Sequence, residues 1–225
     1  MTDALINING DQVQTLEILF LTTFIALVPS MLVMMTCFTR FIIILSFTRT
    51  AMGTQQQPPN TVLIGMALIL TIFAMRSTIV EIEQTAYDPY VNEEISQSEF
   101  LDLASIPLKE FMLTQIVEWE NETTIAMYCD LSGEPMASSV ETLVDLPLIV
   151  VVPAFITSEL KVAFMCGFLI SIPFLLLDMV IASTLMSMGM MMLPPSLISL
   201  PFKLLLFVFV DGWTELFQAL IKGIY

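Results

Sequence analysis

The chain contains no histidine and few charged residues of either sign. Only 13% of its 225 residues are charged, and 7 Lys and Arg stand against 22 Asp and Glu. Without histidine, the chain lacks the commonest metal ligand and the commonest general base at neutral pH. The formal net charge of −15 also disfavours binding to nucleic acid, whose phosphates repel an acidic surface.

Cysteine chemistry and the common catalytic motifs are missing as well. The cysteines Cys37, Cys129 and Cys166 are far apart and form no C-x-x-C pair, so we expect them to be packing residues. No P-loop, Rossmann glycine pattern or G-x-S-x-G elbow occurs. An intramembrane hydrolase would need a Ser/Lys or Asp/Asp pairing, for which no motif is visible. The sequence therefore predicts a non-enzymatic protein without metal or cofactor.

Apolar residues, in contrast, make up 56% of the chain and give a mean hydropathy of +0.86, which indicates a membrane protein or a large apolar interface. The run from Ile18 to Thr39 has 22 residues without a charge, enough to cross a bilayer core of about 30 Å. A second apolar run, between Arg40 and Arg49, is too short to cross alone and either extends the first helix or turns back. A glycine and two prolines within 52–60 predict a break, and Thr61–Met75 a second apolar helix.

Residues 81–142 differ in kind, because they hold fourteen of the acidic residues and only one base, Lys109. Apolar residues at helical spacing predict an amphipathic helix over 107–128, and 134–141 has the composition of a loop. The segment is either a small polar helical domain or a solvated acidic insertion with no task of its own.

The few basic residues suggest an orientation in the membrane. Arg40 and Arg49 would place the first connection in the cytoplasm by the positive-inside rule. The acidic insertion at 81–142, almost without basic residues, then lies on the far side of the membrane.

The stretches Asp145–Lys161 and Lys161–Asp178 are apolar but carry several prolines. Each proline frees a carbonyl that lipid cannot satisfy, so such helices are poor lipid-facing rods. We expect proline-broken helical hairpins buried against other subunits. The prolines are Pro147, Pro153 and Pro173.

The 24 residues between Asp178 and Lys203 carry no charge, and the double proline Pro194–Pro195 predicts helix, break and helix. Two apolar arms folded back on each other would expose a tip rich in methionine, whose flexible thioethers close around irregular surfaces. The tip is predicted to be either a seal or adaptable core filling. Its methionines are Met186, Met188, Met190, Met191 and Met192.

Five charges lie in apolar surroundings, where an unpaired ion is costly and partners are expected. With the double proline as the tip of a symmetrical hairpin, Asp178 falls level with Asp211, and Lys203 has no acid opposite it. Lys203 is therefore predicted to pair with Glu159, from the preceding hairpin or from a neighbouring copy, unless these groups only mark helix ends. The five charges are Glu159, Lys161, Asp178, Lys203 and Asp211.

Several long motifs stand in a fixed order along the chain: FTRFIIILSFTRTAMGTQQQPPN at 38–60, PAFITSELKVAF at 153–164, and GMMM-L-PP, LPFKLLLF and VDGW after 188. From about Met31 onward the sequence resembles the FliP/SctR family, the export-gate subunits of flagellar and injectisome type III secretion. TRFIIIL, SELK and VDGW look more like the flagellar branch.

This resemblance implies a pore-forming subunit of the flagellar protein export gate in the bacterial inner membrane, at the flagellar basal body. It implies a homo-oligomer, a pentamer, that is raised above the bilayer plane, passes unfolded substrates and has FliQ, FliR, FlhB and FlhA as partners. It also implies an ion pair between subunits from Glu159 to Lys203 and a pore seal at Met188, Met190, Met191 and Met192. Many members begin with a cleavable signal, whereas the start MTDALININGDQVQ lacks a basic n-region.

The expected fold is all-α and membrane-associated, in four parts. Residues 1–17 are a polar N-terminal segment, 18–80 an apolar helical region, 81–142 a periplasmic helical insertion, and 143–225 the helical hairpins of the gate core. The competing function is a small-solute secondary transporter with Glu159, Lys161 and Asp178 as an intramembrane relay, although the two halves show no evident repeat.

Overall fold

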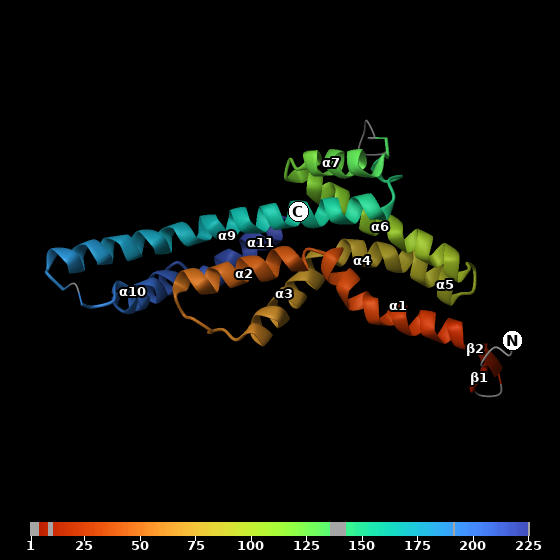
Figure 1. The fold of residues 1–225 in the computed structure, drawn as a ribbon, viewed down its shortest axis with the longest axis horizontal. Helices are drawn as coiled ribbons and strands as arrows, with labels where there is room; N and C mark the ends of the chain where they lie inside the picture. The colour runs from red at the N-terminus through yellow and green to blue at the C-terminus, as the bar shows by residue number, and fades with distance from the viewer. Residues whose placement is uncertain (1–4, 9–10, 136–142, 191, 225) are drawn as a thin grey trace.

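The computed structural model describes residues 5–8, 11–135, 143–190 and 192–224. Its dominant element is helix α9, Leu148–Ser187, which at about 1.5 Å per residue is about 60 Å long. Figure 1 shows α9 running along the long axis of the molecule to one end, with the helix over 195–209 folded back beside its far half and most of the other helices nearer its beginning. The expectation of a helical protein is confirmed for the described residues, apart from a short antiparallel pairing of β1 (Leu5–Ile8) with β2 (Asp11–Gln14).

Helix α9 contradicts the expected pair of proline-broken segments, because Pro153 and Pro173 both lie inside it. The helix is nevertheless continuous through both positions. Helix α2 (Phe38–Met52) runs beside α9 so closely that a Cβ on Gly167 would stand 2.6 Å from the ring of Phe47. Just before the second proline, the Ser171 hydroxyl donates to the Gly167 carbonyl at 2.8 Å. The two prolines therefore do not break the helix here.

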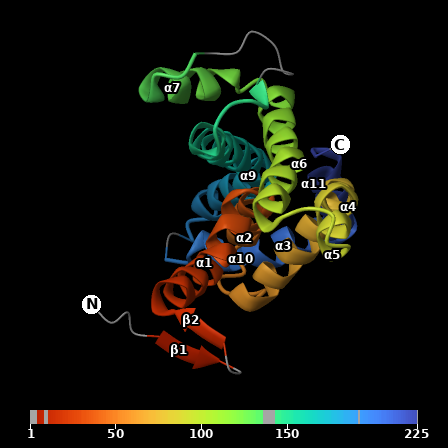
Figure 2. The ribbon, with the colours of Figure 1, turned by 90° about the vertical axis from the view of Figure 1, so that its right-hand side faces the viewer.

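The first two apolar runs form separate helices. Helix α1 spans Thr15–Met34, and α2 begins after a short turn, so the second run forms a helix of its own that neither extends α1 nor folds back along it (Figure 1). The break after α2 is confirmed: Gly53 ends the helix in the left-handed region, with φ 76°, and α3 spans Asn60–Ala74. Figure 2 shows α1 leaving the body of the molecule on the side of α9 opposite to α7.

The insertion contains more helices than expected. Beyond Met75, α4 (Arg76–Ile82) continues through the π-helical turn η1 (Glu83–Tyr87) into α5 (Asp88–Val91), and α6 (Gln97–Glu118) and α7 (Glu122–Ser132) follow. The single helix predicted over 107–128 is wrong. The chain turns between α6 and α7, where Glu120 adopts a left-handed φ of 52°. Most of the loop predicted at 134–141 lies outside the described residues.

Two apolar clusters hold these helices together. One joins α2 and α3 to the C-terminal helix α11 (Gly212–Lys222) through residues such as Phe41, Leu63 and Leu220. The other joins α6 and α7 to the start of α9. Its fully buried members are Met112, Leu113, Ile116, Ile125, Cys129, Val150, Val151, Ala154 and Phe155. The acidic insertion is therefore packed onto α9 through a shared core.

The hairpin between α9 and α10 (Pro195–Phe209) turns earlier than predicted. A Schellman motif ends α9: the Gly189 amide donates to the Met186 carbonyl at 3.1 Å, and the Met190 amide to the Leu185 carbonyl at 3.0 Å. Gly189 takes a φ of 74°, which glycine adopts without strain. The double proline is thus not the break after α9. It begins α10, where Pro194 is the N-cap and Pro195 the first helical residue.

The VDGW motif forms the bend of 62° between α10 and α11. Asp211 is exposed and takes a left-handed φ of 49°. Gly212 follows it where a Cβ would stand 2.4 Å from the ring of Phe207. The indole of Trp213 packs edge-on against that ring, with 5.2 Å between the ring centroids. Glycine is needed at this corner because two aromatic side chains fill it.

Candidate functional site

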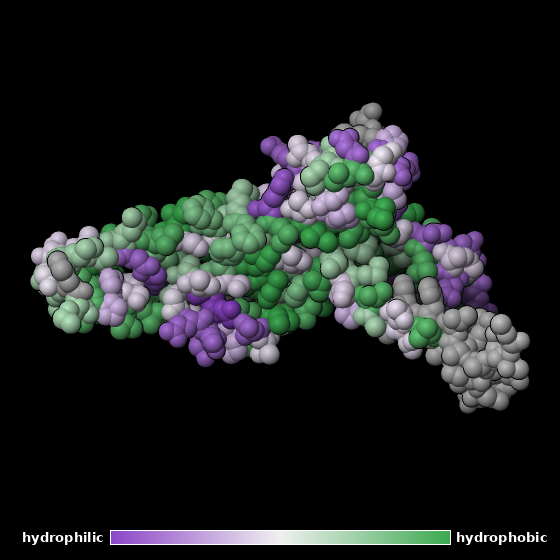
Figure 3. All heavy atoms as spheres, in the orientation of Figure 1, coloured by the Kyte–Doolittle hydropathy of each residue, from purple (hydrophilic) through white to green (hydrophobic). Residues whose placement is uncertain are grey.

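The candidate seal lies at the far end of the α9–α10 hairpin. Met188 is 72% exposed, Met190 42% and Met192 98%, while Met191 lies outside the described residues. Apolar side chains also cover the outer surface of α9 leading to this end, and the hydrophilic residues gather over α7 and the α2–α3 connection (Figure 3). The tip is therefore a cluster of uncovered thioethers on a long apolar arm.

Behind the tip, an ion pair joins the two arms of the hairpin. Lys203 Nζ donates to Asp178 Oδ2 at 2.6 Å, and the Ser199 hydroxyl donates to Asp178 Oδ1 at the same distance. The inference that Lys203 lacks an acid in its own hairpin is therefore wrong, as is the level pairing of Asp178 with Asp211. Turning at Gly189 and not at the double proline shifts the register of the two arms, so Lys203 comes opposite Asp178.

A second ion pair is completely enclosed between α2 and α9. Arg40 Nε donates to Glu159 Oε2 at 2.8 Å, and Arg40 Nη2 donates to Glu159 Oε1. Arg40 is 2% exposed and Glu159 is 0% exposed. The sequence predicts no partner for Arg40, because the spacing of two residues 119 positions apart does not indicate that their side chains meet.

These two ion pairs bear on the predicted contact between Glu159 and Lys203. Nineteen residues of α9 separate Glu159 from Asp178, which is about 28 Å along the helix, so Glu159 and Lys203 do not meet inside one chain. Each has a partner of its own. A pair between subunits stays a prediction, and it would require at least one of them to leave the partner it has here.

Neutral groups complete the surroundings of Arg40. Arg40 Nη2 also donates to Gln115 Oε1 at 3.0 Å, and Arg40 Nη1 donates to the Gly223 carbonyl at 2.9 Å. The Trp119 ring lies against the guanidinium, with its centroid 5.3 Å from Cζ. We call Arg40, Glu159, Gln115 and Trp119, with the carbonyls of Gly223 and Ile224, the buried polar hub. Gln115 lies within the segment 107–128 whose apolar spacing predicted a helix, and its amide is the polar group that this face contributes to the hub.

The remaining candidate residues do not assemble a relay. Lys161 is exposed on the outer surface of α9, Glu159 faces α2, and Asp178 lies about 28 Å along the helix from Glu159. Glu159 is bound to Arg40 and Asp178 to Lys203, so the three groups do not share one site. The geometry therefore disfavours the solute-transporter hypothesis.

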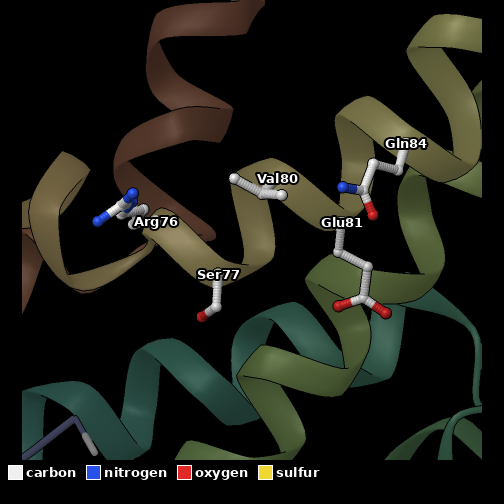
Figure 4. A pocket seen from close by; sticks show the side chains of 5 residues that line it. All are labelled: Arg76, Ser77, Val80, Glu81 and Gln84. Atoms are coloured by element: carbon white, nitrogen blue, oxygen red, sulfur yellow. The ribbon is translucent and has the colours of Figure 1, made fainter.

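No metal centre accompanies these features in the part of the chain that the structure describes. No group of three or more His, Cys, Asp or Glu side chains there is arranged to hold a metal ion. A depression of about 440 Å³ lies on α4 and η1, where Arg76 and Glu81 point in different directions (Figure 4). Cys37 and Cys129 are fully buried, and burial raises the pKa of the Cys129 thiol, as expected for packing residues.

The helices define the class of the protein. Among the described residues, α9 is long and apolar enough to cross a membrane, and the bent pairs α3 with α4–α5 and α10 with α11 would each make a further span if they act together. A helical membrane protein with apolar hairpins and internally paired charges is the class that these elements support.

Comparison with known proteins identifies the family. The FliP family model matches residues 21–220. The chain is 49% identical to the flagellar biosynthetic protein FliP of Bacillus subtilis (strain 168) over 209 residues, which cover 93% of this chain and 91% of the relative. It is 45% identical to the protein of that name from Pectobacterium carotovorum subsp. carotovorum, covering 96% and 82%, and 44% identical to that from Aquifex aeolicus (strain VF5), covering 95% and 87%. The chain belongs to the FliP family.

Proposed function

We propose that this chain is a pore-forming subunit of the flagellar type III protein export gate in the bacterial inner membrane, closed at rest by a methionine-rich seal. Several copies would surround an axis and pass unfolded flagellar substrates between them. The observation that carries the proposal is the tip of the α9–α10 hairpin, where Met188, Met190 and Met192 are exposed at the end of an apolar arm about 60 Å long.

The charge distribution along the arm supports this role. Lys203 is neutralised by Asp178, and Glu159 by Arg40, so these four groups can lie against apolar neighbours without leaving any of their charges unpaired. Exposed apolar side chains follow the outer face of α9 over much of its length. Other copies of the chain and the companion subunits FliQ, FliR and FlhB would cover this surface, with FlhA on the cytoplasmic side and the acidic insertion on the periplasmic side.

A seal of this kind is physically reasonable. Methionine has three rotatable bonds and a polarizable sulfur, so several tips can pack into an irregular plug that excludes water and ions. The same flexibility allows the plug to open around an unfolded chain and to close behind it. The chain itself would supply neither the energy nor the substrate choice.

Replacement of the exposed tip methionines by alanine tests the proposal. The variant carrying Met188→Ala, Met190→Ala and Met192→Ala should assemble with its companion subunits and leak small ions when the complex is reconstituted in vesicles. Met179→Ala is the matched control, because this exposed methionine of α9 lies about 13 Å back from the tip along the helix. Unchanged permeability in the assembled triple variant would rule out a methionine seal.

The small-solute transporter is the second candidate, and the two differ in their state of assembly. A channel lined by hairpin tips requires several copies, whereas a transporter can act as one chain. The mass of the gently extracted complex separates them: a large ring supports the export gate, and a monomer contradicts it.

A further inference from the structure

The turn after α11 is bound by two buried side chains, Arg40 of α2 and Gln115 of α6, and by the partly buried Trp119 at the end of α6. The Gly223 carbonyl accepts hydrogen bonds from Arg40 Nη1 at 2.9 Å and from Trp119 Nε1 at 3.4 Å. The Ile224 carbonyl accepts one from Gln115 Nε2 at 3.0 Å. The chain end that follows α11 thus meets α2 and α6, both far from it in sequence, at the buried polar hub (Figure 1).

These contacts are favoured by the electrostatics of a helix end. The last carbonyls of an α-helix have no partner within the helix and carry its partial negative charge. At the end of α11 they meet the guanidinium of Arg40 and two N–H donors. Arg40 donates to the Glu159 carboxylate of α9 through Nε and Nη2. The end of α11 supplies the acceptor for the remaining nitrogen, Nη1.

Apolar packing places the helix end correctly. Leu216, Leu220 and Ile224 lie on one side of α11 and enter the core shared with α2 and α3. Gly223 lies against Trp119, where a Cβ would stand at the ordinary contact distance of 3.5 Å from the indole. The apolar side chains therefore place this turn of the chain beside the donors that bind it.

We propose that the end of α11 is a clasp that holds the acidic insertion against the long helix. While the carbonyls of Gly223 and Ile224 are bound, the donors of Arg40 and Gln115 are satisfied, and α2, α6 and α9 meet in one arrangement. When the clasp leaves, these buried donors lose their acceptors and the junction loosens. This conformational role does not depend on the export-gate function.

The structure offers a direct readout of the clasp. Lys222 is exposed, and it immediately precedes the bound Gly223. Trypsin needs several residues around a cleaved bond to be extended, so in the folded chain it can cut after Lys222 only when the last turn opens. The rate of cleavage after Lys222 therefore reports the open population.

We would compare the full chain, extracted in mild detergent, with its Gln115→Leu variant. Leucine keeps the size of the side chain but removes the donor to Ile224 and the acceptor for Arg40. Trypsin should cut after Lys222 at least tenfold faster in this variant. Gln218→Leu makes the same chemical change on the exposed side of α11, and its cleavage rate should equal that of the wild type.

Hydrogen exchange tests the coupling to the insertion. In Gln115→Leu, and in a chain that ends at Lys222, the last turns of α6 and the first turn of α2 should exchange faster than in the wild type. If Gln115→Leu does not fold by circular dichroism, Trp119→Phe keeps an aromatic ring and removes only the indole donor, and its cleavage should still exceed that of Gln218→Leu.

Three results would overturn the proposal. The first is wild-type cleavage after Lys222 as fast as in a free peptide of residues 212–225. The second is the same cleavage rate in the Gln115→Leu and Gln218→Leu variants. The third is faster cleavage with unchanged exchange in α2 and α6, which would show that the helix end opens without loosening the junction.

Discussion

Arg40 and Glu159 lie 119 residues apart in the sequence, yet the guanidinium of one holds both carboxylate oxygens of the other inside the protein. This pair fixes α2 against α9 where the insertion and the end of the chain also meet. Both side chains are almost fully desolvated, so each needs the other. The energetics of the molecule are therefore most sensitive at this point.

Removal of one member of this pair should be strongly destabilising. Arg40→Met leaves the Glu159 carboxylate buried without its cation, and we expect a loss of about 3–5 kcal/mol in the free energy of unfolding. The double variant Arg40→Met, Glu159→Leu removes both charges and should recover part of that loss. Thermal unfolding in detergent measures both. A double variant less stable than the single one would show that the neutral hub contacts dominate.

Charge exchange can distinguish contacts within a chain from contacts between subunits. The exchange of Arg40 and Glu159, as Arg40→Glu with Glu159→Arg, should restore part of the assembly lost in Glu159→Arg alone. If Glu159 pairs with Lys203 of a neighbouring copy, Glu159→Lys should abolish assembly and added Lys203→Glu should partly restore it. The mass of the extracted complex reports both. Failure of the second rescue, with success of the first, would rule out the pair between subunits.

The pair between Lys203 and Asp178 should show a measurable coupling energy. In a double-mutant cycle of Asp178→Asn and Lys203→Met, we expect a coupling of roughly 0.5–3 kcal/mol, because the two groups are in direct contact. Asp211→Asn is the control. Asp211 is an exposed acid that follows the end of α10, so its substitution should show no coupling with Lys203→Met. Equal couplings in both cycles would contradict the observed pairing.

Two glycine substitutions should have opposite effects on stability, because Gly167 lies at the close approach of α2 and α9 and Gly65 lies in open space. Gly167→Ala places a methyl group 2.6 Å from the Phe47 ring and should destabilise the protein by roughly 1–3 kcal/mol. Gly65→Ala lies in α3 with no atom within 4 Å of the new methyl group, and it should stabilise by up to about 1 kcal/mol. Added Phe47→Leu should relieve the first effect. Unfolding midpoints compare all three variants.

Acid should loosen the start of α6. Ser96 and Glu99 form a capping box in which the Ser96 backbone amide and hydroxyl donate to the Glu99 carboxylate, each at 2.8 Å. These hydrogen bonds lower the pKa of Glu99 below its ordinary value of 4.5. A lowered pKa means that the stabilisation is present above that ordinary value and is lost as the pH falls through the lowered one. Hydrogen exchange in the first turn of α6 should increase over this acid range, and Glu99→Gln should reduce the pH dependence.

Much of the helical framework could be predicted, because apolar runs and turn residues are local signals. The break after Met52 and the helix over Asn60–Ala74 follow from glycine, proline and apolar spacing. The single helix over Leu148–Ser187 could not be predicted, since its two internal prolines are local signals for a break, whereas its close packing with α2 involves residues distant in sequence. The same applies to the division between α6 and α7, where one residue takes a left-handed conformation.

By itself, the sequence determined the apolar helical class, the methionine-rich hairpin and the membership of a family whose motifs are intact. Only the tertiary structure decided which charges meet. The hairpin turns at Gly189, because the Schellman motif satisfies the carbonyls at the end of α9, and that register brings Lys203 to Asp178. Arg40 reaches Glu159 because two helices distant in sequence pack side by side, and pairing at such a distance leaves no trace in local spacing.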